Sequence, residues 1–480
     1  MSKVRTRFAP SPTGFMHVGN LRTALYEYLV AKSLDGAFVL RIEDTDRERY
    51  VDGAVDVIYN TLKTAGLIHD EGPDKGGEYG PYVQSERKDI YLPYAEELIK
   101  EGKAYRCFCT KERLEEVQNQ TVGGGYDRHC RDLSQEEIDR LLEAGTPYVI
   151  RQKMPIDGET KFTDAVFGEI TVDNSELQDQ ILIKADGYPT YNFANVIDDH
   201  TMGITHVVRG SEYLSSTPKY NLLYEGFGWP IPKYIHCSPV MRDQHNKMSK
   251  RHGDPSYEDL KNQGYLTDAI INYVALLGWS PRGDKAEQEV FSLTELAESF
   301  DLGGMSKSPA IFDINKLTHF NAMYLRAMTP EAFAEVAAPY IRQVVTNEEI
   351  DVNAIATLLQ ARCERLTEIP EKVDFFDELP EYDIEFFTNK KSKTTPEVCR
   401  DMLKAAIPAL EAIGEWTMDA VHGTLIGLAE SLGVKNATLM WPLRISIAGK
   451  TVTPGGAVEI CQILGKDECI RRLKLGLAKL

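Results

Sequence analysis

The sequence lacks any run of about 18 consecutive apolar residues, which is the length that a helix needs to span a bilayer. Residues 1–8 also lack the apolar core of a secretory signal. The chain contains no internal repeat and no low-complexity tract. These absences argue against a membrane-spanning, secreted or collagen-like protein, and they predict a folded protein of the cytoplasm with no membrane partner.

Cysteine is scarce and unevenly placed. Three of the eight cysteines, Cys107, Cys109 and Cys130, fall within one short stretch. This spacing fits reduced thiols or metal ligands better than a disulfide framework.

Basic residues are also in deficit, because 54 Lys and Arg face 73 Asp and Glu, a net charge of -19. An acidic total argues against indiscriminate binding to nucleic acid. One locally basic face on such a repulsive surface would instead favour docking in a single register.

With 480 residues and 42% hydrophobic content, the chain has room for about three domains with buried cores. Residues 4–9 predict a strand, residues 20–34 a helix, and residues 37–42 a buried parallel strand. This order predicts a Rossmann-like α/β start, with ligands at the carboxyl ends of the strands. Three acidic residues, which could alternatively begin a helix, follow the second strand at that edge: Glu43, Asp44 and Asp46.

His17 lies in the loop before the predicted helix, where Pro12 and Gly14 force a turn. Such a loop points unpaired backbone N–H groups outward and therefore suits an anion. Gly19 leaves space beside the imidazole. Taken alone, His17 fits better as a residue that merely caps the helix in a tight loop.

A basic segment, Lys-Met-Ser-Lys-Arg, occupies residues 247–251. Its lysines supply point charges that suit a polyphosphate, although a short basic segment is more often solvated surface. Together with His-Val-Gly-Asn at residues 17–20, it resembles the paired signatures of class I aminoacyl-tRNA synthetases.

Further segments narrow this resemblance. Residues 7–14 and the string Arg-Ile-Glu-Asp-Thr-Asp at residues 41–46 are similar to amino-acid-binding segments of glutamyl-tRNA synthetases. Similar strings follow at residues 188–191, 195–199, 208–212 and 441–444. The resemblance covers the whole chain, which is identified as similar to the bacterial glutamyl-tRNA synthetases.

The resemblance implies ATP-dependent ligation of glutamate to the terminal ribose of tRNA(Glu) through a glutamyl-adenylate, and it leaves open the charging of tRNA(Gln). It implies catalytic roles for His17, Lys247, Ser249 and Lys250. It implies glutamate binding by Arg7, Ala9, Ser11, Glu43, Tyr191, Asn195 and Arg209. It implies ATP binding, with Mg²⁺, by Thr13, Gly14, His17, Gly19, Asn20, Glu212 and Lys250.

Arg7 and Arg209 both stand at the ends of predicted strands that face one crevice. A guanidinium grips a carboxylate with two parallel hydrogen bonds, so an amino acid with two carboxylates suits two arginines. Either arginine alone would fit a structural ion pair, and the assignment therefore depends on the family match.

The cysteine cluster lies in a region of short strands and helices that interrupts the α/β alternation. Its thiols could bind Zn²⁺, with Tyr126 or His129 as the fourth ligand. Some family members carry a similar knuckle with His two residues after the third Cys, where this chain has Asp132. Ordinary thiols beside a degenerate knuckle are the alternative.

The α/β fold class implied by the resemblance comprises a Rossmann-like catalytic domain, a connective insertion that grips the tRNA acceptor end, a stem-contact domain and an all-helical anticodon-binding domain. The expected segments are the first catalytic half (1–104), the insertion (105–184), the second catalytic half (185–240), the stem-contact domain (241–315) and the helical domain (316–480).

In the discriminating members of the family, an Arg of the helical domain reads the last anticodon base of tRNA(Glu). Arg362 lies about where that residue should be, with Arg365 one turn on. Such arginines are often solvated or paired with acids, here Glu364 or Glu368. The basic stretch at residues 389–395 is interpreted as a solvated linker.

Three other classes stay open, and the chain is expected to be a monomer. A shortened synthetase-like enzyme that modifies a tRNA base would lack the helical tail. A small-molecule nucleotidyltransferase would need neither insertion nor tail. A non-catalytic RNA-binding paralogue would have lost His17 or the lysines, which are intact.

Overall fold

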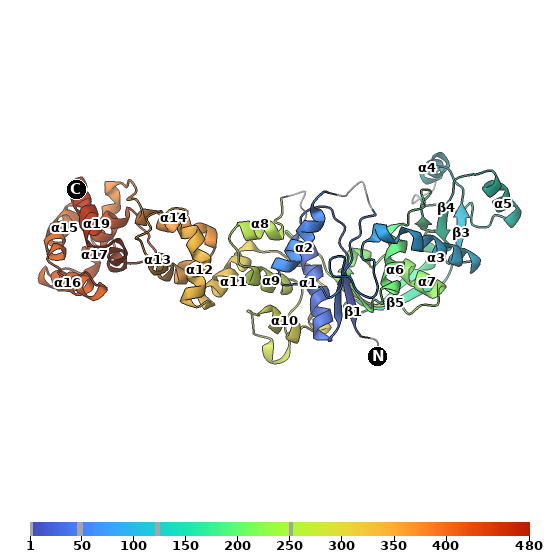
Figure 1. Cartoon of the computed structure of the whole chain (residues 1–480), viewed down its shortest axis with the longest axis horizontal. Helices are drawn as coiled ribbons and strands as arrows, with labels where there is room; N and C mark the ends of the chain where they lie inside the picture. Colours follow the sequence, from blue (N-terminus) through green and yellow to red (C-terminus); the bar gives the residue numbers. More distant parts are fainter. Residues whose placement is uncertain (1–2, 46–50, 121–124, 249–252) are drawn as a thin grey trace. The chain divides into compact units, whose positions relative to one another are not determined.

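The structure is a computed structural model that describes residues 3–45, 51–120, 125–248 and 253–480 (Figure 1). The chain forms two compact units. The N-terminal unit comprises Met1–Asp259 and Ile270–Asp313, and the C-terminal unit comprises Leu260–Ala269 and Ile314–Leu480. In the described ranges, every helix is too short or too polar to traverse a lipid bilayer.

All the strands belong to the N-terminal unit. They are β1 (Arg5–Phe8), β2 (Ala37–Leu40), β3 (Ala104–Cys107), β4 (Val149–Gln152), β5 (Glu159–Asp164), β6 (Gly168–Asp173), β7 (Ile181–Ile183), β8 (His206–Gly210), β9 (Lys233–Cys237), β10 (Val240–Met241) and β11 (Ala310–Ile311). The α-helices of this unit are α1 (Val18–Ser33), α2 (Ala54–Thr64), α3 (Lys88–Lys100), α4 (Lys111–Gln120), α5 (Gln135–Glu143), α6 (Tyr191–Thr201), α7 (Thr217–Gly226) and α10 (Leu293–Ser299).

Helices α8 (Tyr257–Asn262) and α9 (Thr267–Ala275) contain residues of both units. The C-terminal unit continues with α11 (Ile314–Ala327), α12 (Pro330–Ile341), α13 (Val352–Leu359), α14 (Ile369–Val373), α15 (Pro396–Glu411), α16 (Met418–Ser431), α17 (Asn436–Ala448), α18 (Ala457–Leu464) and α19 (Lys466–Lys479).

Parallel pairing brings the ends of four strands to one edge. β1 pairs in parallel with β2, β8 pairs in parallel with β9, and β1 lies beside β8. The backbone N–H of Thr205 donates to the carbonyl oxygen of Arg5 at 3.0 Å, which ties the start of β8 to β1. Ligands in parallel α/β sheets bind beyond the carboxyl ends of the strands, so this edge is where a site is expected.

Helix α1 packs against β1, β2 and β8. Its buried face includes Leu21, Leu25 and Leu29, which lie four residues apart and therefore on one face of the helix. The prediction of a strand, a helix and a strand is confirmed, with a difference at the helix start. The helix begins at Val18 rather than Asn20 because the side chain of His17 caps it.

Part of the predicted insertion joins the sheet that contains β8 and β9. β3, β4 and β7 form a separate antiparallel sheet, and α4, α5, β3 and β4 lie together in Figure 1. The β5–β6 hairpin, however, joins β9, with Asp164 opposite Tyr234. An alternating hairpin carries no local signal of its neighbour, so the sequence did not predict this pairing.

The solvated linker predicted at residues 389–395 is confirmed only in part, because Lys390, Lys391 and Lys393 are exposed, but the stretch is not an open linker. Asn389 and Thr394 exchange backbone hydrogen bonds at 3.1 and 3.0 Å, and Ser392 and Thr394 are buried. The hydroxyl of Thr438 in α17 also donates to the carbonyl oxygen of Ser392 at 2.7 Å. The stretch is a turn docked on α17, because its short polar side chains and backbone find partners inside the unit.

Arg472 in α19 is a buried cation in the C-terminal unit. Its side chain is 1% exposed, and it donates to the carbonyl oxygens of Phe375 and Ile447 and to Glu468. Arg471 pairs with the same Glu468, but its side chain is 56% exposed. The two adjacent arginines therefore differ mainly in burial.

We expect Arg472→Met to lower the free energy of unfolding of the C-terminal unit by about 2–4 kcal/mol, because buried carbonyl oxygens lose their donor. The matched control, Arg471→Met, should cost no more than about 0.5 kcal/mol. Denaturant unfolding followed by tryptophan fluorescence measures both. Equal losses in the two variants would contradict a role for the buried carbonyl contacts.

Candidate active site

A cavity of about 390 Å³ opens at the carboxyl edge of the parallel strands. Ala9 follows β1, Arg209 and Gly210 end β8, and Cys237 ends β9, and all four line it. Other predicted site residues on its wall are Arg7, Ser11, Thr13, His17, Gly19, Asn20, Glu43, Tyr191, Glu212 and Lys247. The fold thus gathers into one cavity residues that lie far apart in the chain.

His17 occupies the N-cap of α1. Its Nδ1 accepts hydrogen bonds from the backbone N–H groups of Gly19 at 3.0 Å and Asn20 at 3.3 Å. A neutral ring with Nδ1 as acceptor carries its proton on Nε2. The imidazole therefore occupies the backbone N–H groups of Gly19 and Asn20.

Two glycines of the cavity wall leave room for a neighbouring side chain. A Cβ on Gly19 would lie 3.0 Å from Cε1 of His17, and a Cβ on Gly210 would lie 2.3 Å from Oε2 of Glu212. Any larger residue would displace the imidazole or the carboxylate. Both glycines thus hold space for a predicted ATP-binding side chain.

Lys247 reaches the same cavity from a hairpin. Met241 pairs with Lys247 in an antiparallel bridge, and the N–H of Met248 donates to the carbonyl oxygen of Val240 at 3.1 Å. A second bridge joins His17 to Ser256. The chain after the basic segment therefore lies beside a residue of the cavity wall. Ser249, Lys250 and Asp46 lie outside the described residues.

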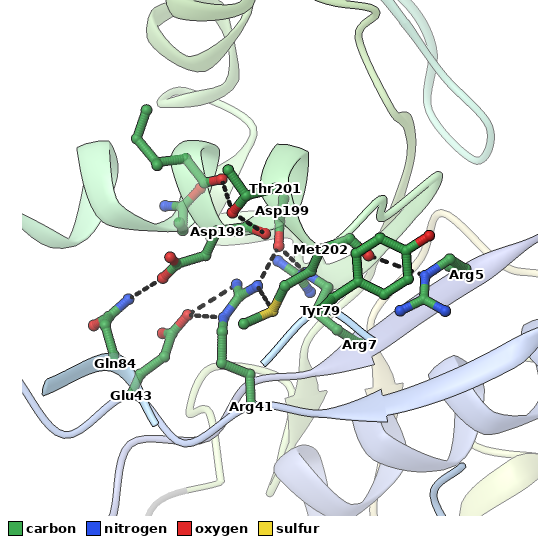
Figure 2. Close-up of polar contacts among 12 residues, drawn as sticks. Arg5, Arg7, Arg41, Glu43, Tyr79, Gln84, Asp198, Asp199, Thr201 and Met202 are labelled. Carbon is green, nitrogen blue, oxygen red and sulfur yellow. Dashed lines mark hydrogen bonds and ion pairs between the residues drawn. The ribbon is translucent and has the colours of Figure 1, made fainter. Parts of the chain in front are cut away.

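Asp199 in α6 connects two buried arginines. Its Oδ1 accepts from Nε of Arg7 at 2.9 Å and from Nη1 of Arg41 at 2.8 Å. Arg41 also pairs with Glu43 at 3.1 Å, and Arg7 pairs with Glu27 at 3.1 Å. Figure 2 shows Arg41 between the carboxylates of Glu43 and Asp199, with Arg7 on the same Asp199 oxygen.

Burial and charge set the ionisation of these acids. Burial raises the pKa of Glu43 to about 7 against the attraction of Arg41 and Arg7. Burial also raises the pKa of Glu27 well above its usual range, although Arg7 opposes this. For Asp199, burial acts upward, but Arg7 and Arg41 outweigh it and lower the pKa. Asp199 is therefore the ionised carboxylate that the two arginines share.

Arg209 is held differently from Arg7. Its Nε donates to Nε2 of His236 at 3.1 Å, and its Nη2 donates to the hydroxyl of Thr217 at 2.9 Å. No carboxylate among the described residues forms an ion pair with it, whereas Arg7 has two acidic partners. Of the two predicted carboxylate-binding arginines, Arg209 is the one whose charge no described carboxylate compensates.

Two predicted residues stand off the cavity wall. Asn195 is buried, and its Nδ2 donates to the carbonyl oxygen of Tyr191 at 3.0 Å, while Gly14 supplies the turn before His17 with a φ of 107°. Tyr191 itself lines the cavity and is 37% exposed.

Sequence reasoning missed buried charged residues that support the cavity. Arg22 in α1 donates to the carbonyl oxygens of Leu277, at 2.8 Å, and Ser238, and so ties the helix to the chain after β9. Asp199 and Glu27 were also missed. The available signal was a charged residue on an otherwise apolar helix face, which must find a partner when it is buried.

The three clustered cysteines come together. The Sγ atoms of Cys107, Cys109 and Cys130 all lie within 4.8 Å of one another. The hydroxyl of Tyr126 lies 3.2 Å from Sγ of Cys107 and 3.8 Å from Sγ of Cys109. His129 does not belong to the cluster in the described part of the chain, so Tyr126 is the better placed of the two candidate ligands.

The ionisation of this cluster is uneven. The hydrogen bond with Cys130, helped by Tyr126, lowers the pKa of Cys107 to about 4 despite burial. Burial raises the pKa of Cys109, with a further contribution from the charge on Cys107. Three clustered thiols, one of which has a lowered pKa, suit a cation because the thiolate is the form of cysteine that binds metal. Asp132 pairs with Lys153 at 3.2 Å and lies away from the thiols.

A second cavity, of about 440 Å³, lies in the C-terminal unit. Trp441 and Arg444 of α17 line it, and the Arg444 guanidinium lies 4.6 Å from the Trp441 ring centroid. Burial and the nearby charge of Arg362 lower the pKa of Arg444. Arg362 donates to the carbonyl oxygens of Thr453 and Pro454, rather than to an acid.

Arg365 is placed differently from Arg362. Its backbone N–H donates to Oε1 of Glu368 at 3.3 Å, and it precedes a short 3-10 turn that contains Glu368. Neither Arg362 nor Arg365 is among the residues that line the second cavity.

Comparison with known proteins identifies the family. Residues 3–319 match the family described as tRNA synthetases class I (E and Q), catalytic domain, and residues 332–477 match the anticodon binding domain. The chain is 56% identical over 483 residues to a glutamate–tRNA ligase of Clostridium acetobutylicum, covering 100% of this chain and 99% of that one. It is 57% identical to a glutamate–tRNA ligase of Clostridium tetani, covering 100% and 98% of the two chains.

A solved structure agrees over the full length. The crystal structure of a glutamate tRNA ligase from Elizabethkingia meningosepticum, in complex with its amino acid, matches with a TM-score of 0.91 and 36% identity over 100% of both chains. The predicted resemblance and the α/β fold class with a helical C-terminal domain are confirmed. The chain belongs to the glutamate–tRNA ligases, a family of class I tRNA synthetases.

Proposed function

We propose that this chain ligates glutamate to tRNA(Glu) in two ATP-dependent steps. The observation that carries the proposal is the single cavity that contains His17, Lys247 and Arg209, because it joins groups for a phosphate, a leaving pyrophosphate and a carboxylate. Charging of purified tRNA(Glu) with labelled glutamate tests it, and a chain that forms no glutamyl-tRNA would refute it. A preference for tRNA(Glu) over tRNA(Gln), the monomeric state and a cytoplasmic location stay predictions.

Arg209 would bind the side-chain carboxylate of glutamate. Its charge has no acidic counterpart among the described residues, and a guanidinium prefers a carboxylate to a neutral amide. Glu43, which also lines the cavity, would accept a hydrogen bond from the substrate ammonium group once its carboxyl is ionised. Arg7 would add a donor while Asp199 holds it in place.

In the first step, an oxygen of the glutamate α-carboxylate attacks the α-phosphorus of ATP. A new P–O bond forms, the bond to the β-phosphate oxygen breaks, and pyrophosphate leaves with the electron pair. The enzyme contributes position and charge, so His17 would donate to a phosphate oxygen and Lys247 would stabilise the leaving group, with Lys250 in the same role. Mg²⁺ would accompany ATP as a counter-ion.

In the second step, a hydroxyl of the terminal ribose of tRNA attacks the carbonyl carbon of the adenylate. The ester bond to the ribose forms, the bond from the carbonyl carbon to the phosphate oxygen breaks, and AMP leaves with the electron pair and takes up the hydroxyl proton. Both steps use the same cavity, so the acceptor end must enter it while the amino acid stays bound.

We also propose that Cys107, Cys109, Cys130 and Tyr126 hold one Zn²⁺ in a structural site. The three thiols lie close enough to bind a common ion, and their position between β3 and the following segment would fix the fold of the insertion. The metal would thus stabilise the region expected to grip the acceptor end.

Anticodon recognition is proposed for the second cavity. The Trp441 ring and the Arg444 guanidinium on its wall, with the charge of Arg362 close to Arg444, suit an unstacked base and its acceptor atoms. The carbonyl contacts of Arg362 to the turn at Thr453 support a position beside such a base, as does its closeness to Arg444.

His17→Ala should lower glutamyl-adenylate formation by two or more powers of ten, a loss of roughly 3–4 kcal/mol of transition-state stabilisation. Lys250→Ala should do the same. His17→Asn is the matched control, since Asn also caps helices but offers no imidazole N–H. Pre-steady-state adenylate formation with tRNA present measures the effect. Near-normal formation in His17→Asn would reduce His17 to a helix cap.

Arg209→Gln should weaken glutamate binding and let glutamine compete. The introduced amide no longer attracts the carboxylate of glutamate, but it can hydrogen-bond to the neutral side chain of glutamine. The measurement is the ratio of kcat/KM for the two amino acids in tRNA charging. Arg5→Gln is the control, because Arg5 of β1 pairs with Glu71 and does not line the cavity. An unchanged ratio in Arg209→Gln would show that this residue does not read the side chain.

Protein prepared without chelator should contain one zinc per chain by metal analysis, and Cys107→Ser should remove it. Cys399→Ser replaces a buried thiol of α15 and should leave the metal content unchanged. Absence of zinc from the wild-type protein would leave only the interpretation as ordinary thiols.

A further inference from the structure

A buried hydrogen-bonded chain runs behind Arg209 across three neighbouring strands. Asp164 ends β5, His236 lies in β9 and Arg209 lies in β8. Oδ2 of Asp164 lies 2.7 Å from Nδ1 of His236, and Nε of Arg209 lies 3.1 Å from Nε2 of His236. The side chains of Asp164 and His236 are both 0% exposed, so water does not compete for these bonds.

Chemistry fixes the direction of each bond. A guanidinium only donates, so Nε2 of His236 must accept from Arg209, and the imidazole proton must lie on Nδ1 and point to Asp164. The ring is therefore neutral. Burial lowers the pKa of His236, and the neighbouring Arg209 contributes, although the bond to Asp164 acts in the opposite direction.

The β5–β6 hairpin anchors the far end of the chain. Oδ1 of Asp164 accepts from the backbone N–H groups of Val166 at 2.9 Å and Phe167 at 2.8 Å. Oδ2 also accepts from the backbone N–H of His236 at 3.1 Å. These bonds leave the carboxylate no freedom to rotate, so the orientation of the imidazole follows from the fold of the hairpin.

The near end fixes Arg209. Besides His236, the guanidinium bonds the hydroxyl of Thr217 through Nη2 and lies 4.6 Å from the ring centroid of Tyr220. Among the described residues, no acceptor pairs with Nη1, and Arg209 lines the cavity. The chain thus fixes the plane of the guanidinium through two of its nitrogens and leaves the third for a ligand.

We infer that Asp164 and His236 are positioning residues for amino-acid selection, which orient Arg209 toward the substrate carboxylate without neutralising its charge. A carboxylate placed directly on Arg209 would compensate its charge, as Asp199 does for Arg7. The neutral imidazole between Asp164 and Arg209 avoids this. The inference rests on the proposed role of Arg209 as the reader of the side chain.

Two substitutions at one position test the inference. His236→Asn keeps a donor for Asp164 but places no acceptor at Arg209, whereas His236→Gln can extend its carbonyl oxygen to that point. We expect His236→Asn to lower the ratio of kcat/KM for glutamate over glutamine by roughly 10-fold or more, mainly through KM for glutamate. His236→Gln should recover most of the ratio.

A matched control exists in the same unit. His69 is a buried histidine that pairs with Asp74 at 2.7 Å, the same distance as the His236–Asp164 pair, but it does not line the cavity. His69→Asn should leave the ratio unchanged. If His236→Asn fails to fold, Thr217→Val removes the other acceptor at similar volume and should shift the ratio in the same direction.

A double substitution separates positioning from general damage. In the Arg209→Gln background, His236→Asn should not change the ratio further, since no guanidinium remains to be oriented. If Arg209→Gln abolishes the preference for glutamate while both His236→Asn and Thr217→Val retain it, the positioning role of Asp164 and His236 is refuted. The role of Arg209 in reading the side chain then stands. If Arg209→Gln retains the preference, both fail.

Discussion

Asp199 holds two arginine side chains with one carboxylate oxygen, and the arrangement of the active-site cavity depends on this contact. Burying Arg7 and Arg41 without an acidic partner would be costly, because removing one member of a buried pair typically costs about 3–5 kcal/mol. With Asp199 in place, both guanidiniums stay fixed beneath the strand ends. Glu43 is then held by Arg41 on the cavity wall, and the positive charge of this cluster is compensated within the protein.

Arg209 differs from Arg7 and Arg41 because no carboxylate among the described residues compensates its charge. It stands one strand away from Arg7, yet its partners are a neutral imidazole and a hydroxyl. Two arginines at the same sheet edge are therefore electrostatically unlike, although the sequence presents them as equivalent. The difference matters for function because a cation that is already paired attracts an anionic substrate weakly.

Local signals in the sequence predict much of this molecule. Alternation and turn residues locate β1, α1 and β2. The presence of both the His17 motif and the basic segment in one sequence identifies the family. The contacts that distinguish the residues are not local. Arg7 meets Asp199, and Asp164 meets His236, only after the sheet has formed, and no spacing in the sequence encodes these pairs. For the same reason, the sequence does not distinguish Tyr126 from His129 as a fourth ligand beside the cysteines. In the fold, the Tyr126 hydroxyl lies beside the thiols.

The difference in charge between the two arginines is tested most directly by a crystal structure of this chain with glutamate bound. The account predicts that the side-chain carboxylate lies within hydrogen-bonding distance of Arg209, while Arg7 and Arg41 keep their bonds to Asp199. A structure in which the carboxylate displaces Asp199 from Arg7 and leaves Arg209 without contact to the substrate would contradict it.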